Sequence, residues 1–192
     1  MKIYAKDYPN QNGRIPVIEA IDGQLITNCI WMSPTEKEHC LVTNTESDVL
    51  KMVVYNRYKT AAPSIAFIKN FEFTHGAIAS TVAHDSHNII AVGVDDESIT
   101  TAINSVIQEK GGVSCVNKTE IKILPLPVAG LMSNADPYEV AKQYTIIDAM
   151  SKDLGSSLGS PFMTLSFMAL LVIPHLKLSD QGLFDGDQFK LF

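Results

Sequence analysis

Several features are missing from this sequence of 192 residues, and each absence excludes a class of protein. Positive charge is not in excess: 15 Lys and Arg against 21 Asp and Glu give a net charge of −6, which argues against a nucleic-acid partner. No long apolar run is present either. The longest, Phe162 to Pro174, includes Thr164 and Ser166 and falls short of the roughly 20 residues of a membrane span. We therefore expect neither nucleic acid nor a membrane as a partner.

Signals for export and for disulfide bonds are also missing. Residues 1–10 contain no apolar signal core. The three cysteines, Cys29, Cys40 and Cys115, are odd in number and widely spaced, which suits a reduced compartment better than a disulfide framework. The expected localisation is cytoplasmic.

The usual metal and phosphate motifs are absent as well. The chain has no His-x-His, no Cys-x-x-Cys and no glycine-rich phosphate loop of either common spacing. We therefore predict no metal site from the residues of this chain.

What is present is a series of strand and helix signals. Asp22-Gly23 separates two strand-like runs, which predicts a hairpin, and the polar run 33–47 predicts a loop. Capping and stop signals predict three helices, at about 95–109, 136–155 and 160–171. The fold class expected is α+β or mixed α/β, a largely antiparallel or mixed sheet with about three helices packed on it.

Length and patterning together predict one domain over residues 1–192. Within it we expect opening strands in 1–32, a loop over 33–48 and the main α/β body over 49–192. Helical spacing places Ile99, Ala102, Ile103, Val106 and Ile107 on one face of a helix. It predicts that the core includes Ile99, Ile103, Val106, Val140 and Ile147.

The densest polar cluster is the run His84-Asp85-Ser86-His87-Asn88, which lies between apolar runs at 77–83 and 89–94. Five hydrogen-bonding side chains between two core strands are expected at an end of the sheet, where they can reach solvent or a ligand. One interpretation is a polar turn that caps two strands, since Asp, Ser and Asn are ordinary turn residues. Two histidines in one turn favour a function, because imidazole titrates near neutral pH and binds metals.

Three chemical hypotheses compete for this cluster. His84 and His87 could share a metal, but two ligands do not complete a site. His, Asp and Ser side by side could suggest a hydrolase triad, although triads assemble from distant segments. A general acid/base role for one histidine, oriented by Asp85, fits the spacing best.

The same cluster belongs to a wider resemblance. Residues 76–88, which read GAIASTVAHDSHN, together with the runs at 23–27, 124–132, 161–167, 172–174 and 178–183, resemble the C-terminal domain of adenine deaminases. The similar runs occur in the same order and cover nearly the whole chain.

The resemblance implies part of an amidohydrolase-superfamily enzyme that hydrolyses adenine to hypoxanthine and ammonia in purine salvage. It also implies that manganese or iron binds in an upstream (β/α)₈ barrel, the expected partner, whose motifs do not occur here. The isolated chain is therefore not expected to deaminate adenine. On this hypothesis the candidate catalytic residues are His84, Asp85 and His87, and the candidate substrate contacts are Ser86 and Asn88.

Two other functions stay open at this point. The domain could be a scaffold or a homo-oligomer interface that uses the surface of Met163 to Leu171, with the polar run only capping strands. It could instead be an independent small-molecule binding module that uses the polar run itself.

Overall fold

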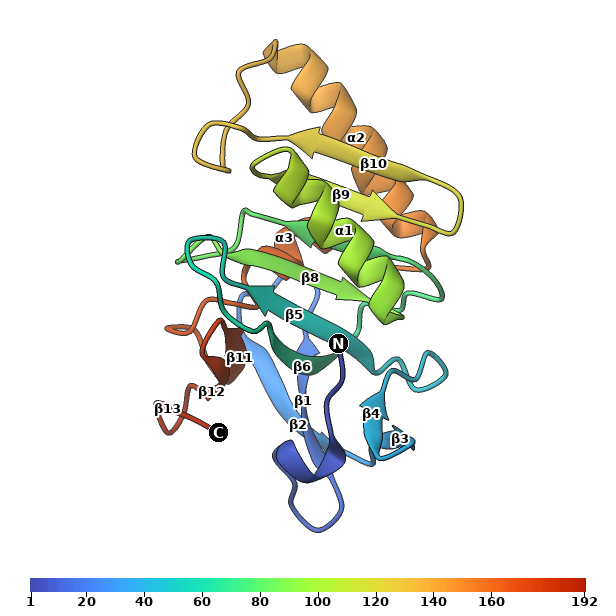
Figure 1. Cartoon of the computed structure of the whole chain (residues 1–192), viewed down its shortest axis with the longest axis vertical. Helices are drawn as coiled ribbons and strands as arrows, with labels where there is room; N and C mark the ends of the chain where they lie inside the picture. Colours follow the sequence, from blue (N-terminus) through green and yellow to red (C-terminus); the bar gives the residue numbers. More distant parts are fainter.

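An eight-stranded sheet forms the centre of the molecule (Figure 1). The computed structural model describes all 192 residues of the chain. The strands of this sheet lie in the order β10 (Ile121–Pro125), β9 (Gly112–Val116), β7 (Ala77–Ser80), β8 (Ile89–Gly93), β5 (Leu50–Tyr55), β6 (Ser64–Lys69), β1 (Ile15–Ala20) and β2 (Thr27–Met32). All neighbouring strands pair antiparallel except β1 and β6, which pair parallel. The expected mixed, largely antiparallel sheet is confirmed.

The opening strands belong to the same sheet as the strands that follow. β1 and β2 form the predicted hairpin, whose register places Ala20 opposite Thr27 and leaves Asp22-Gly23 in the turn. Gly23 has a φ of 69°, a conformation that glycine adopts at little cost. Because β1 also pairs with β6, this hairpin is an edge of the main sheet.

Two smaller sheets depart from the expectations. Inside the predicted loop 33–48, β3 (Thr35–Lys37) and β4 (Cys40–Val42) pair across a turn, so the loop prediction is wrong there. All three residues of β3 are exposed, and an exposed strand carries no apolar alternation that a sequence pattern could detect. The last strands, which we did not predict, form a three-stranded sheet of β11 (Leu176–Ser179), β12 (Gly182–Asp185) and β13 (Lys190–Leu191).

Both faces of the central strands are buried. Along β8, Ile90 and Val92 join one large apolar cluster, whereas Ile89 and Ala91 join a second, because successive side chains of a strand point to opposite faces. Helix α1 (Asp96–Gln108) supplies side chains to the second cluster. Helices α2 (Pro137–Asp153) and α3 (Pro161–Ser166) supply side chains to the first. The sheet thus lies between α1 and the pair α2 and α3 (Figure 1).

Helix α1 begins where its capping signal predicts. The Asp95 carboxylate accepts a hydrogen bond from the Ser98 backbone N–H at 2.7 Å. Ile107, the last residue of the predicted apolar face, is 46 % exposed because it lies at the edge of the apolar stripe. The buried side chains of α1 are those of Ile99, Ala102, Ile103 and Val106.

Helices α2 and α3 follow their start signals, but α3 ends early. Asp136 accepts hydrogen bonds from two backbone N–H groups at the start of α2, and Ile147 is buried as predicted, whereas Val140 is only half-buried. Helix α3 ends at Ser166 rather than near Leu171, since the chain there turns through i→i−3 hydrogen bonds.

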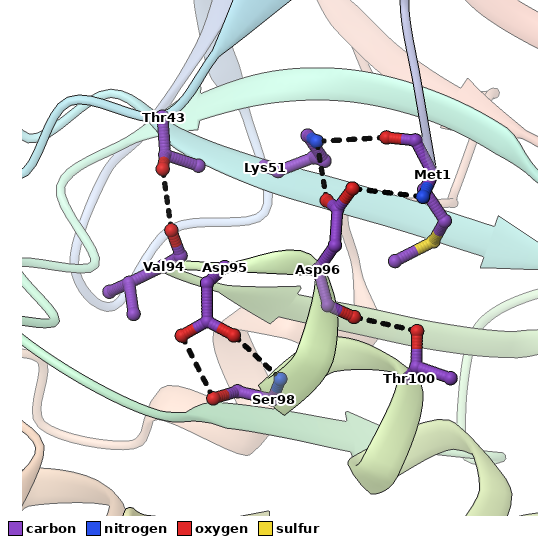
Figure 2. A network of polar contacts seen from close by, with 8 residues as sticks. All are labelled: Met1, Thr43, Lys51, Val94, Asp95, Asp96, Ser98 and Thr100. Atoms are coloured by element: carbon purple, nitrogen blue, oxygen red, sulfur yellow. Dashed lines mark hydrogen bonds and ion pairs between the residues drawn. The ribbon is translucent and has the colours of Figure 1, made fainter.

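A polar network joins β5 to the start of α1 (Figure 2). The buried Lys51 ammonium donates to the Asp96 carboxylate at 2.5 Å and to the Met1 carbonyl at 3.1 Å, while the Met1 ammonium lies 2.8 Å from Asp96. Partial burial raises the pKa of Asp96, but its hydrogen bonds from Lys51 and Met1 outweigh that effect, so its pKa lies below the ordinary value.

No helix of the chain combines the length and the apolar character that crossing a bilayer requires.

Candidate functional site

Parts of the two family-like runs 76–88 and 124–132 lie at one end of the main sheet. Strands β5, β7 and β10 end there, and β8 and β9 begin there, because each is antiparallel to its neighbour. This end lies on the left of Figure 1. Four connections therefore gather at it, over residues 56–63, 81–88, 109–111 and 126–136. We call residues 84–88 the histidine loop.

The backbone of the histidine loop is held from several sides. The Arg57 guanidinium donates through Nε to the His87 carbonyl at 2.7 Å, and the Tyr58 hydroxyl donates to the Ser86 carbonyl at 3.0 Å. The His84 N–H donates to the carbonyl of Ser166, at the end of α3, at 2.9 Å. These bonds fix the path of the loop relative to β5 and α3.

Asn88 holds the loop from the inside. Its side chain is buried, its Oδ1 accepts from the Arg57 backbone N–H at 3.3 Å, and its Nδ2 donates to the Ser86 Oγ at 3.2 Å. Both ends of this amide are therefore occupied within the chain, whereas the Ser86 residue is exposed.

The three ionisable side chains of the loop are, by contrast, without hydrogen-bond partners in the chain. The His84 ring stacks on the Phe167 ring with centroids 4.9 Å apart. The His87 ring lies edge-on to the His84 ring, with centroids 5.5 Å apart. The buried Nδ1 of His87 has no hydrogen-bond partner, which is rare for a buried polar atom. Asp85 is exposed and bonds to neither imidazole, so the hypothesis that it orients a histidine by a hydrogen bond is not supported by the geometry.

The electrostatics of the loop favour neutral imidazole at His87. Desolvation lowers the pKa of His87 from its ordinary value, and repulsion from His84 and Arg57 lowers it further, against a smaller opposing effect of Asp85. A neutral imidazole carries one donor and one acceptor nitrogen, so it can take up a proton from a ligand or water.

The geometry supports neither of the other two hypotheses for the loop, a hydrolase triad and a metal site. The Ser86 hydroxyl bonds to Asn88 rather than to a histidine, which is not the arrangement of a hydrolase triad. No group of three or more His, Cys, Asp and Glu side chains is placed to hold a metal ion, so the two histidines lack a third ligand.

Arg57 joins the histidine loop to the loop after β10. Its Nη2 donates to the Ala129 carbonyl at 2.5 Å and to the Tyr58 hydroxyl at 3.1 Å. Beside it, Gly130 has a φ of 74°, and a Cβ at this position would collide with the Arg57 guanidinium, whose Cζ would lie 2.8 Å away. Both the conformation and the close approach of Arg57 favour glycine here.

Two further contacts tie neighbouring segments to the same end of the sheet. The buried Thr81 hydroxyl donates to the Gly130 carbonyl at 2.5 Å, which ties the end of β7 to the loop after β10. The Asn56 side chain donates to the Asp180 carboxylate at 2.7 Å, which ties the end of β5 to the turn between β11 and β12. Arg57, Tyr58 and Thr81 were not among the candidate residues, because single polar residues beside a strand carry no recognisable motif.

Comparison with known proteins gives this arrangement a context. The family model for the adenine deaminase C-terminal domain matches residues 24–190. The chain is 49 % identical over 177 residues to an adenine deaminase of Methanosarcina acetivorans, covering 92 % of this chain and 32 % of that protein. It is 51 % identical over 174 residues to one of Sulfurovum sp., covering 90 % and 31 %. It is 47 % identical over 186 residues to one of Salinibacter ruber, covering 95 % and 34 %. The chain thus spans about a third of the length of the curated relatives it matches.

Proposed function

This chain belongs to the family of adenine deaminase C-terminal domains, and from that premise we propose that it acts as the C-terminal part of an adenine deaminase. The proposed reaction of the whole enzyme adds water to adenine and releases hypoxanthine and ammonia. Its proposed partner is an upstream amidohydrolase barrel, which would bind the manganese or iron and activate the attacking water. The two histidines of this chain do not complete a metal site, so we assign them no part in holding that ion.

The observation that carries the proposal is that the histidine loop has a fixed backbone but ionisable side chains without partners. Its backbone is fixed by Arg57, Tyr58 and α3, while the side chains of His84, Asp85 and His87 have no hydrogen-bond partner in the chain. Functional groups are most effective when neighbouring residues hold them in place beforehand. A loop built this way is suited to meet a ligand supplied from outside the domain.

We assign roles to the loop residues on that basis. A neutral His87 accepts a proton during the reaction or donates one to the leaving ammonia, and His84 and Asp85 complete the polar wall beside it. The exposed Ser86 contacts the purine, whose ring nitrogens and exocyclic amine need both donors and acceptors. Asn88 is a positioning residue, since its amide is occupied within the loop.

The proposal is tested by replacing each histidine by alanine in a full-length adenine deaminase that carries this domain. We expect kcat/KM to fall by about 10²-fold or more for His87→Ala, as for a positioned acid/base group, with a smaller loss for His84→Ala. His75→Ala is the matched control, because His75 lies just before β7, at the opposite end of the sheet.

Melting temperatures of the same variants separate the proposal from the scaffold alternative. If the loop only caps strands, the alanine variants should melt earlier and keep near-normal turnover. Unchanged kcat/KM in a folded His87→Ala enzyme would refute the catalytic assignment. The surface named for the scaffold alternative, Met163 to Leu171, is largely buried, and only Met163 within it is exposed, so the structure does not favour that alternative.

A further inference from the structure

A cavity of about 500 Å³ lies beside the histidine loop, between the end of β5 and the end of α1. Its size falls within the range of small-molecule sites, roughly 300–1,000 Å³. It is lined by residues 55–60 at the end of β5, by the end of α1 and by Thr81 and Ile89.

The charge of this cavity is unlike that of the chain as a whole. Its lining includes Arg57, Lys59 and Lys110 and no Asp or Glu, although the chain carries a net charge of −6. Neither lysine forms an ion pair within the chain. A concave site with unpaired cations and no acid concentrates anions.

The polar groups of the lining fall into two sets. The side chains of Asn56, Arg57, Tyr58 and Thr81 are engaged in hydrogen bonds within the protein, so they form a fixed wall. The side chains of the second set have no hydrogen-bond partner in the chain and remain available to a ligand; they are Tyr55, Lys59, Thr60 and Lys110.

The rest of the lining is apolar. Ile89 and Val106 are buried, and Ile107, whose side chain is exposed despite its place next to the helix stripe, borders the opening. Apolar walls with a few placed polar groups are typical of sites for small organic molecules.

We propose that this cavity binds a small organic phosphate. A phosphomonoester carries a charge of about −1.5 to −2 at neutral pH, which the two free lysine ammonium groups match. The hydroxyls of Tyr55 and Thr60 supply further donors to its oxygens. The organic part lies against Ile89, Val106 and Ile107. This site is separate from the histidine loop and does not depend on the proposed deaminase activity.

The test is a titration of the ¹⁵N-labelled 192-residue chain, followed by NMR at constant ionic strength. The probes are inorganic phosphate, adenosine monophosphate and adenosine, the last being the uncharged match of the second. We expect saturable shifts of the Thr60, Lys110 and Gly111 amides with both phosphates, tighter binding of adenosine monophosphate, and none of adenosine.

Charge-reversal variants then locate the site. We expect Lys59→Glu/Lys110→Glu to weaken binding of adenosine monophosphate by about tenfold or more, because two attractions become repulsions. Lys118→Glu/Lys142→Glu makes the same charge change at two exposed lysines outside this cavity and should alter binding less than about twofold. If the reversal pair unfolds the chain, the neutral pair Lys59→Gln/Lys110→Gln makes the same comparison.

Three results would overturn the proposal. The first is no saturable shift with either phosphate up to about 10 mM, where even a weak site of millimolar affinity is largely filled. The second is an equal loss of binding in the control pair, which would show that net charge alone attracts the anion. The third is adenosine binding as tightly as its monophosphate. Monophosphate binding no tighter than inorganic phosphate would overturn the assignment of the organic part to the apolar wall.

Discussion

Replacing Gly130 by alanine tests how the loops at the end of the sheet are held together. Gly130 and Gly23 share nearly the same backbone conformation, with φ values of 74° and 69°. They differ in their surroundings: a Cβ at Gly23 would meet nothing within 4 Å, whereas one at Gly130 would collide with the Arg57 guanidinium. Gly23→Ala is therefore the matched control for the backbone strain of Gly130→Ala.

The expected losses of stability follow from these surroundings. Alanine in the left-handed region costs about 1–2 kcal/mol, and both variants lose this amount. The Arg57 guanidinium ends a flexible side chain, so it moves away from a new methyl group and gives up its bonds to the His87 and Ala129 carbonyls. Hydrogen bonds to charged groups contribute about 1.5–3 kcal/mol each, and we take the lower value because this guanidinium is partly exposed. Gly130→Ala should thus cost about 4–5 kcal/mol, against about 1–2 kcal/mol for Gly23→Ala.

Urea unfolding, followed by circular dichroism and by the fluorescence of the single tryptophan, Trp31, measures both losses. The variants should also be made in an Arg57→Ala background. There the two glycine substitutions should cost the same, because the group that Gly130→Ala displaces is gone, and the cycle should return a coupling of about 3 kcal/mol. Equal losses in the wild-type background, or a coupling near zero, would refute the account of Gly130.

Two further predictions concern the core. Ile103→Ala should lower the free energy of unfolding by about 2–5 kcal/mol, because Ile103 is buried. Ile107→Ala on the same helix should change it by less than about 0.5 kcal/mol, because Ile107 is exposed. A loss at Ile107 as large as that at Ile103 would contradict the orientation of α1. Lys177 is fully buried with its ammonium donating to the Leu25 carbonyl at 2.7 Å, and desolvation lowers its pKa to about 8 from the ordinary 10.5. Between these pH values the unfolded chain binds more protons, so the free energy of unfolding should rise with pH from about 8 to 10.5, by at most about 3 kcal/mol relative to Lys177→Met. The same pH dependence in both proteins, measured by urea unfolding, would show that Lys177 is not its source.

Local chemistry made much of the fold predictable from the sequence. The Asp95 and Asp136 caps and the Asp22-Gly23 turn act through bonds or backbone angles within a few residues, so their signals survive in the sequence. The hairpin of β3 and β4 carries no such signal, since β3 is exposed throughout and β4 is only three residues long, with Leu41 its single buried side chain. Helix α3 was predicted too long because the run after Ser166 is apolar throughout, and buried turns and buried helices have the same composition.

The candidate site divides in a similar way. The histidine loop was visible as a polar run between two apolar ones, and its position at the end of the sheet follows from that pattern. The importance of Arg57 was not visible, because its partners are backbone carbonyls, at His87 and Ala129, that any residue would provide. The unpaired lysines of the cavity were hidden for a related reason: Lys59 and Lys110 are far apart in the chain, and only the packing of α1 on the sheet brings them to one cavity.

The burial of both faces of β7 and β8 has a consequence for how these strands find their alignment. In a sheet with one solvent-exposed face, a one-residue shift of strand register would expose apolar side chains to water. Here such a shift would only exchange one buried apolar face for the other. The two faces differ instead in volume. Toward α1 lie Ala77, Ala79 and Ala91, with the larger Ile89 only at the start of β8, and Gly93 is so near to Ile99 that a Cβ there would lie 2.8 Å from the Ile99 Cγ1. A shift would force the larger Ile78 and Ile90 under α1, where there is no room for them. Side-chain size, rather than polarity, therefore selects the native register of this pair.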